Sequence, residues 1–255
     1  MANKRNFQKE LEEILNKKQQ DGIVPSLFLH SCCAPCSSYV IEYLSDFFKI
    51  TVFYYNPNIY PDEEYRHRVK EQQNLIRQIP QKYPVSFLEG DFDKERFYEM
   101  AKGLEQVPEG GERCFRCYRL RLDQTAKLAK EQGFDYFCTT LSISPLKNAR
   151  KLNEIGQELG DTYGIPWLPS DFKKKNGYKR SVELSALYAY TARITVAVSF
   201  PGQKEKLSSE TAEQLRNRTF IKTAQPFERQ ICRFKGFVFK FVTSLRFLCI
   251  MTGII

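Results

Sequence analysis

Histidine is scarce in this 255-residue chain, which contains only two, His30 and His67. A zinc site built from several imidazoles is therefore excluded. The chain also lacks a Ser-Gly-Gly-x-Asp-Ser phosphate loop after its first expected strand, which argues against a nucleotide-binding enzyme of the adenylating or thiolating type. Internal repeats and low-complexity segments are absent too, which excludes a repeat architecture.

Long hydrophobic runs are also missing. Lys240 and Arg246 interrupt the apolar stretch at residues 237–255, whereas a membrane-spanning helix needs about 20 predominantly apolar residues. Residues 1–20 are charged and helical in pattern, without the apolar segment of a signal peptide. We therefore expect no membrane contact and a cytoplasmic, reducing location.

The excess of positive charge is concentrated in one part of the sequence. The formal net charge is +9, from 39 Lys and Arg against 30 Asp and Glu. Residues 189–255 contain 11 Lys and Arg and 4 Asp and Glu, so residues 1–188 contain 28 basic and 26 acidic residues. Global charge is therefore weak evidence about what the main domain binds.

Eight cysteines in a reducing compartment indicate metal or redox chemistry. Cys32, Cys33 and Cys36 fall within five residues, between an expected strand at residues 26–31 and an expected helix at 37–47. A helix N-terminus favours the thiolate over the thiol. Neighbouring cysteines suit a strained disulfide poorly and a polynuclear cluster better. The alternative is that the three are small buried hydrophobic residues.

A second pair, Cys114 and Cys117, opens a long expected helix at residues 114–132, and its spacing places both sulfurs on one helix face. Such a pair alone fits zinc, a redox disulfide or half of an iron–sulfur site. Zinc with Cys32 and Cys33 as the other ligands is awkward, because zinc pairs are usually separated along the chain. Two neighbouring cysteines plus this pair suit a [4Fe–4S] cluster better.

Other residues near these cysteines have open interpretations. Arg113, Arg116 and Arg119 would balance the negative charge of a cluster, or form a solvated helix face. Cys36 would bind a second metal ion or fill the turn. His30 is either a donor to the metal ligands or a core histidine, and an apolar strand makes packing the favoured role of Cys138.

Alternating strands and helices predict a Rossmann-like α/β fold, with a largely parallel sheet and helices on both faces. The expected strands are residues 26–31, 50–55, 85–88 and 134–140, with a short fifth strand at 165–168. The expected helices are residues 6–20, 37–47, 62–77, 91–103, 114–132, 148–159 and, beginning at Ser181, 181–188. Segments 32–33, 56–60 and 140–144 follow strands, so they should meet at one edge of the sheet.

Five motifs occur in order between residues 24 and 188. They are SCCAPC (31–36), YNPNIYP (55–61) with Glu64-Tyr65, ERCFRCYRLRL (112–122), TTLSISP (139–145) and DFKKKNGYKRS (171–181). With them the chain resembles the cobalamin-independent epoxyqueuosine reductases, the QueH family. The resemblance implies an adenine-nucleotide hydrolase-like α/β fold and reduction of epoxyqueuosine to queuosine in tRNA. It implies a [4Fe–4S] cluster on Cys32, Cys33, Cys114 and Cys117, and an unidentified electron donor.

Epoxide removal needs two electrons and an acceptor for the oxygen, and a cluster with an exchangeable iron can supply both functions. The substrate contacts expected from the resemblance are Asn56, Asn58, Tyr60, Lys147, Asn148, Lys174, Tyr178 and Arg180. Among them, basic side chains of the loop at residues 173–180 would meet phosphates, and Tyr178 could stack on a base. The alternative for the chain is a zinc-stabilised or nucleotide-binding module that interacts with RNA without redox catalysis.

The sequence departs from the family after residue 188. The family continues with Leu-Tyr-Arg-Gln-(Asp/Asn)-Tyr-Cys-Gly-Cys, whose two cysteines form the redox-active dithiol, and this chain has no such pair. Permitted codons for residues 189–200, read from the third base of each, spell Leu-Tyr-Arg-Gln-Asp-Tyr-Cys-Gly-Cys-Gln-Phe-Ser. We therefore expect a domain at residues 1–188 and an out-of-frame tail at 189–255. Cys232 and Cys249 would then be accidental, and activity impaired or absent.

The hypothesis of a frameshift near residue 188 makes a prediction about the sequence of the coding DNA. The third bases of the codons for residues 189–200 should spell the dithiol motif when read in the shifted frame. Sequencing the gene checks this, and third bases that do not encode Cys-Gly-Cys would exclude the frameshift.

Overall fold

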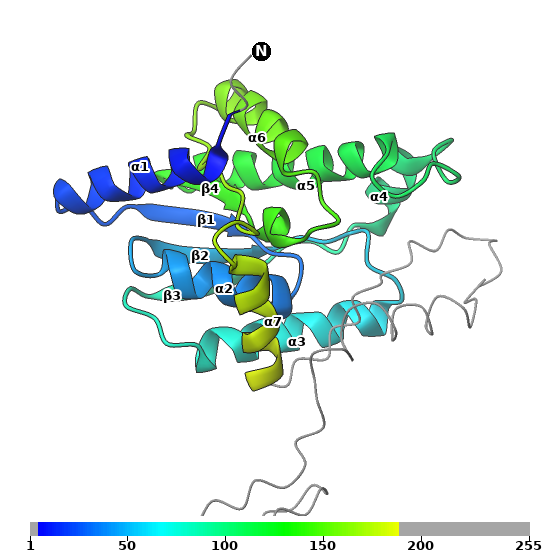
Figure 1. Cartoon of the computed structure of the whole chain (residues 1–255). Helices are drawn as coiled ribbons and strands as arrows, with labels where there is room; N and C mark the ends of the chain where they lie inside the picture. The colour runs from blue at the N-terminus through cyan, green and yellow to red at the C-terminus, as the bar shows by residue number, and fades with distance from the viewer. Residues whose placement is uncertain (1–4, 189–255) are drawn as a thin grey trace, which may run out of the picture. The chain divides into compact units, whose positions relative to one another are not determined.

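A four-stranded parallel sheet organises the computed structural model, which describes residues 5–188 (Figure 1). The strand order is β3-β2-β1-β4. The strands are β1 (Ser26–His30), β2 (Lys49–Tyr54), β3 (Val85–Glu89) and β4 (Tyr136–Thr139). Our predictions for residues 189–255, including Cys232 and Cys249, lie outside this described part.

Helices cover both faces of the sheet, as expected. Figure 1 shows α5 and α6 on one side, and α2, α3 and α7 on the other. The helices are α1 (Phe7–Gln20), α2 (Ala34–Leu44), α3 (Asp62–Gln78), α4 (Lys94–Ala101), α5 (Glu112–Glu131), α6 (Ala149–Tyr163) and α7 (Gly177–Leu187). A 3₁₀ turn, η1 (Thr140–Ile143), follows β4. Within the described residues, no helix has the length and apolarity that crossing a bilayer requires.

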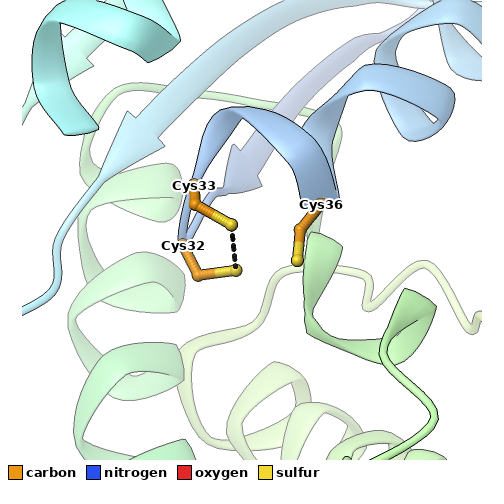
Figure 2. A group of neighbouring side chains, drawn as sticks. All are labelled: Cys32, Cys33 and Cys36. Carbon is orange, nitrogen blue, oxygen red and sulfur yellow. Dashed lines mark hydrogen bonds between the residues drawn. The ribbon is translucent and has the colours of Figure 1, made fainter. Parts of the chain in front are cut away.

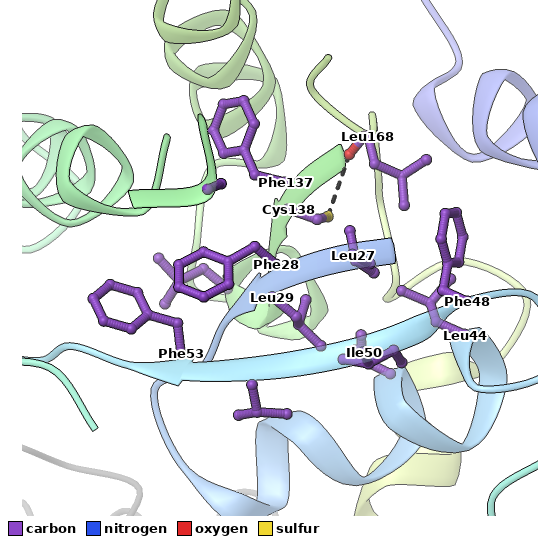
Figure 3. Close-up of a cluster of buried hydrophobic side chains, with 14 of the residues drawn as sticks. Leu27, Phe28, Leu29, Leu44, Phe48, Ile50, Phe53, Phe137, Cys138 and Leu168 are labelled. Atoms are coloured by element: carbon purple, nitrogen blue, oxygen red, sulfur yellow. Dashed lines mark hydrogen bonds between the residues drawn. The ribbon is translucent and has the colours of Figure 1, made fainter. Parts of the chain in front are cut away.

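The central strand β1 is buried on both faces, which explains its continuous apolar run Leu27-Phe28-Leu29. Phe28 stacks on Phe53 of β2 with ring centroids 4.9 Å apart, and both rings lie in the core drawn in Figure 3. Each such side chain contributes about 1.5–3 kcal/mol through burial. This core fixes where β1 ends and therefore where the cysteine turn begins.

Several elements differ from the sequence prediction, and three of these differences concern α2, α7 and residues 165–168. Helix α2 begins at Ala34, because Cys33 is its N-cap and Pro35 occupies the first turn, where proline is favoured. Helix α7 begins at Gly177, so the end of the expected basic loop is helical. The expected fifth strand at residues 165–168 forms only an isolated parallel bridge between Trp167 and Phe137 of β4. Pro166 and Pro169 flank Trp167, and proline cannot donate to a ladder.

Asn153 of α6 fastens this irregular segment to the domain. Its side-chain oxygen accepts from the indole N–H of Trp167 at 3.0 Å and from the backbone N–H of Ser170 at 2.9 Å. Its side-chain amide donates to the carbonyls of Ala149 and Ser170, each at 2.8 Å. All four bonds are buried, so their loss would leave several polar groups without partners.

We expect Asn153→Ala to lower the free energy of unfolding by about 2–4 kcal/mol, because each buried polar group left unpaired costs about 1–3 kcal/mol. Chemical denaturation of the full chain measures this. The matched control is Gln157→Ala, an exposed position of the same helix, which should change stability by less than about 0.5 kcal/mol. Equal stability of the two variants would contradict the role given to Asn153.

Candidate metal centre

Three cysteine sulfurs gather at the carboxyl end of β1. The sulfurs of Cys32, Cys33 and Cys36 all lie within 4.8 Å of one another, and those of Cys32 and Cys33 are 3.8 Å apart (Figure 2). Cys33 caps α2 and Cys36 lies in its first turn. The cluster therefore occupies a helix N-terminus at the sheet edge where the sequence predicts ligand chemistry.

The three thiols do not ionise independently. Hydrogen bonds from the thiols of Cys33 and Cys36 hold the pKa of Cys32 well below its usual value. The pKa values of Cys33 and Cys36 are raised by their hydrogen bonds to Cys32 and by burial. The three thiols therefore hold one negative charge among them. A bound cation would let further thiolates form, because each thiolate then gains an opposite charge nearby.

Cys114 and Cys117 lie in the first turns of α5. The Cys117 side chain is buried against Phe97, Ala101 and Leu120 of a small core cluster. Cys114 is half-buried, and its sulfur accepts from the backbone N–H of Gly110 at 3.3 Å. Neither belongs to the group of sulfurs within 4.8 Å, which contains Cys36 instead. Ligands of different irons in a cluster lie farther apart than ligands of one ion, so the four-cysteine set stays a prediction.

His30 is a fully buried, neutral connector next to the cysteine turn. Burial, followed by the positive charge of Arg121, lowers its pKa to about 3. Its Nε2 faces the carbonyl of Tyr55 at 3.1 Å, which can only accept, so Nε2 carries the proton. Nδ1 then accepts from the hydroxyl of Thr139 at 2.8 Å. His30 thereby joins the ends of β1, β2 and β4. Of the two roles that the sequence left open for His30, these contacts match that of a core histidine.

The three arginines that the sequence offered as partners of a cluster are engaged elsewhere. Arg113 donates to the carbonyl of Glu105 at 2.7 Å. Arg116 pairs with Glu112 of its own helix at 3.0 Å, and Arg119 pairs with Glu158 of α6. The last two are exposed, so the solvated-face interpretation holds for Arg116 and Arg119.

Sequence reasoning missed Arg121, which is only 5% exposed. Its Nε donates to the carbonyl of Cys117 at 3.1 Å, and its Nη1 donates to the side-chain oxygen of Asn56 at 3.5 Å. The spacing of Cys114, Cys117 and Arg121 already placed them on one helix face. That periodicity was the available indication of its position.

The loop after β2 has a structural residue and two candidate contact residues. Asn56 is buried and donates to the carbonyl of Ser31 at 2.8 Å, so it holds the cysteine turn. The Asn58 side-chain oxygen is buried without a hydrogen-bond partner among the described residues. Tyr60 is 45% exposed. Asn58 and Tyr60 therefore keep polar or aromatic groups available to a ligand, whereas Asn56 does not.

The loop before α6 contains one residue in an ion pair and one residue that caps the helix. Lys147 forms an ion pair with Glu109 at 2.9 Å. The side chain of Asn148 caps α6 by accepting from the backbone N–H of Lys151 at 3.0 Å. Leu146 beside them is 61% exposed, the second large exposed side chain near this edge after Tyr60.

The basic segment at residues 173–180 is partly neutralised within the chain. Arg180 forms a two-pronged ion pair with Glu42 of α2, at 2.9 and 2.6 Å, and Lys175 pairs with Glu12 of α1 at 2.6 Å. Lys174 is exposed. Burial raises the pKa of Tyr178, a half-buried residue of α7, which packs against α2.

Cys138 lies apart from these groups. Its side chain is fully buried in β4, and its thiol donates to the carbonyl of Leu168 at 3.2 Å (Figure 3). Burial raises its pKa to about 12, which keeps it protonated. These contacts agree with the packing role expected from the sequence.

Comparison with known proteins finds one family. The family model described as "Epoxyqueuosine reductase QueH" matches residues 27–191. A curated protein of that name from Staphylococcus epidermidis is 42% identical over 183 residues, which cover 70% of this chain and 77% of the relative. One from Streptococcus pyogenes is 42% identical over 185 residues, covering 72% of each chain. One from Staphylococcus aureus is 35% identical over 213 residues, covering 82% and 89%.

Proposed function

This chain belongs to the epoxyqueuosine reductase QueH family, and we propose that its substrate is epoxyqueuosine in tRNA, which the family reduces to queuosine. The reaction consumes two electrons and two protons, breaks both carbon–oxygen bonds of the epoxide, and leaves an alkene and water. The observation that carries the proposal is the group of three close cysteine sulfurs at the sheet edge, in a chain 42% identical to named reductases.

The cofactor that we propose for this site is a [4Fe–4S] cluster. Cys32 and Cys33 at the end of β1 and Cys114 and Cys117 at the start of α5 would hold it. Thiolate ligands give such a cluster negative charge, and Arg121 supplies a buried positive charge beside them. When bound, the cluster would supply electrons and a Lewis acid for the epoxide oxygen.

Cys36 is left over from this ligand set. Its sulfur lies within 4.8 Å of those of Cys32 and Cys33, which is close enough for a metal ion next to the cluster. We propose Cys36 as a ligand of that possible second ion. The disulfide expected during turnover involves the family's dithiol, which this chain lacks.

The surrounding side chains would orient the modified base. Asn58 and Tyr60 follow β2, and Lys147 precedes α6 at the same edge of the sheet. Tyr178 is half-buried in α7, and Lys174 is exposed for a phosphate contact. Arg180 pairs with Glu42 and Asn148 caps α6, so both are weaker candidates than the sequence suggested.

Residues 1–188 would form the reductase domain, and residues 189–255 an out-of-frame tail outside it. The match to the family model ends at residue 191, near this division, whereas the 82% of the chain aligned with the Staphylococcus aureus relative is longer than residues 1–188. Because the tail lacks the Cys-x-Cys pair, we expect this chain to have impaired or no activity. A cytoplasmic location, with its tRNA and an unidentified electron donor, follows from the same proposal.

We predict that the anaerobically purified chain contains about four iron and four sulfide per chain, the content of a [4Fe–4S] cluster. Cys33→Ser and Cys117→Ser should each lose most of both, because a hydroxyl is a poor ligand for this iron. The control Cys138→Ala removes a buried thiol whose contacts are with Leu168 and Ser170 and should keep both. About one zinc per chain without sulfide would instead favour the zinc-stabilised module.

Activity is tested in cells without another epoxyqueuosine reductase, by mass spectrometry of tRNA nucleosides. With this chain we expect epoxyqueuosine to persist, and with a copy restored to the other frame after residue 188 we expect queuosine. Epoxyqueuosine with both copies would refute the proposed reaction. Queuosine with both copies would show that the missing dithiol is dispensable.

A further inference from the structure

Arg121 is a buried cation without a carboxylate partner among the described residues. Its side chain is 5% exposed, and its hydrogen bonds go to the Cys117 carbonyl and the Asn56 amide oxygen, which are both neutral. The other buried arginine, Arg68, pairs with Glu64 at 2.7 Å. A buried charge is costly unless an opposite charge compensates it, so the position of Arg121 calls for an anion.

The contacts of Arg121 link the helix that carries one cysteine pair to the turn that carries the other. On one side its Nε holds the carbonyl of Cys117 at 3.1 Å. On the other side its Nη1 donates to Asn56 at 3.5 Å, and Asn56 donates to the carbonyl of Ser31 at 2.8 Å. Ser31 directly precedes Cys32. A chain of buried hydrogen bonds therefore connects the helix that carries one pair with the turn that carries the other.

The anion that fits is formed by the cysteines themselves. The hydrogen bonds through Asn56 connect the guanidinium to the carbonyl of Ser31, so Arg121 lies close to the turn that bears Cys32 and Cys33. An iron–sulfur cluster on thiolates would supply the missing negative charge at this place.

We propose that Arg121 is a positioning residue for the iron–sulfur cluster: it balances the cluster's negative charge and links the Cys117 backbone to the turn that bears Cys32 and Cys33. This inference rests on the proposed function, since it requires the cluster. A fixed positive charge favours the more negative, reduced state, so Arg121 should raise the reduction potential of the cluster.

The test compares variants of the full chain, purified anaerobically and loaded with iron and sulfide. Arg121→Gln removes the charge, whereas Arg121→Lys keeps the charge and loses the planar fork of donors. The control Arg150→Gln makes the same change at an exposed arginine of α6 that pairs with Glu154. Potentiometric titration followed by electron paramagnetic resonance gives the potential of each cluster, and a chelator gives its rate of iron loss.

For Arg121→Gln we expect the ratio of reduced to oxidised cluster at a fixed potential to fall at least tenfold, which is about 59 mV for a one-electron couple. Arg121→Lys should keep the potential near that of the unmodified chain but lose iron faster, since lysine cannot bridge the same two acceptors. Arg150→Gln should match the unmodified chain in both measurements.

Equal potentials for Arg121→Gln, Arg150→Gln and the unmodified chain would overturn the inference, as would equal shifts in the Gln and Lys variants. If Arg121→Gln does not fold, Arg121→Lys decides alone, and iron loss no faster than in the unmodified chain would overturn the inference. An unmodified chain without iron and sulfide would refute the proposed cofactor itself. This result differs from a bound cluster whose reduction potential does not depend on Arg121.

Discussion

Crowding three thiols into one buried turn is the constraint on which the rest of this molecule depends. The sulfurs of Cys32, Cys33 and Cys36 are so close that, without a cation, ionising one suppresses ionisation of the others. The turn is held there by a fully buried strand β1 before it and by the first turn of α2 after it. Sheet and helix together hold the three thiols where a bound cation would let more than one of them ionise.

The polar groups around this turn are satisfied by a small set of buried side chains. His30 uses both ring nitrogens to join three strand ends, and Asn56 holds the Ser31 carbonyl. Such networks fix geometry because a missing partner leaves a buried polar group unsatisfied. They explain how a site assembled from segments far apart in the sequence can keep one arrangement.

Sequence reasoning was most successful where a chemical motif coincided with a break in hydrophobic pattern. The cysteine turn, the parallel sheet and the shared edge of residues 32–33 and 56–60 followed from such patterns. It was less successful with charges. Arg113 and Arg119 were noticed because they flank the cysteines, yet their contacts lie elsewhere, whereas Arg121 faces the site from one turn further along. On a helix, residues next to each other in the sequence point in different directions, so charges interact only when their side chains lie on the same face.

The sequence by itself determined the fold class, the family and the place of the cysteine turn, because periodicity and motif spacing are local properties of the chain. Only the tertiary structure decided which side chains are buried and which charges are compensated. Arg180 forms an ion pair with Glu42, which is 138 positions away in the sequence, and Arg121 donates to Asn56, which is 65 positions away. The energy of such a charge depends on burial and on its nearest partners, which are set by packing between distant segments.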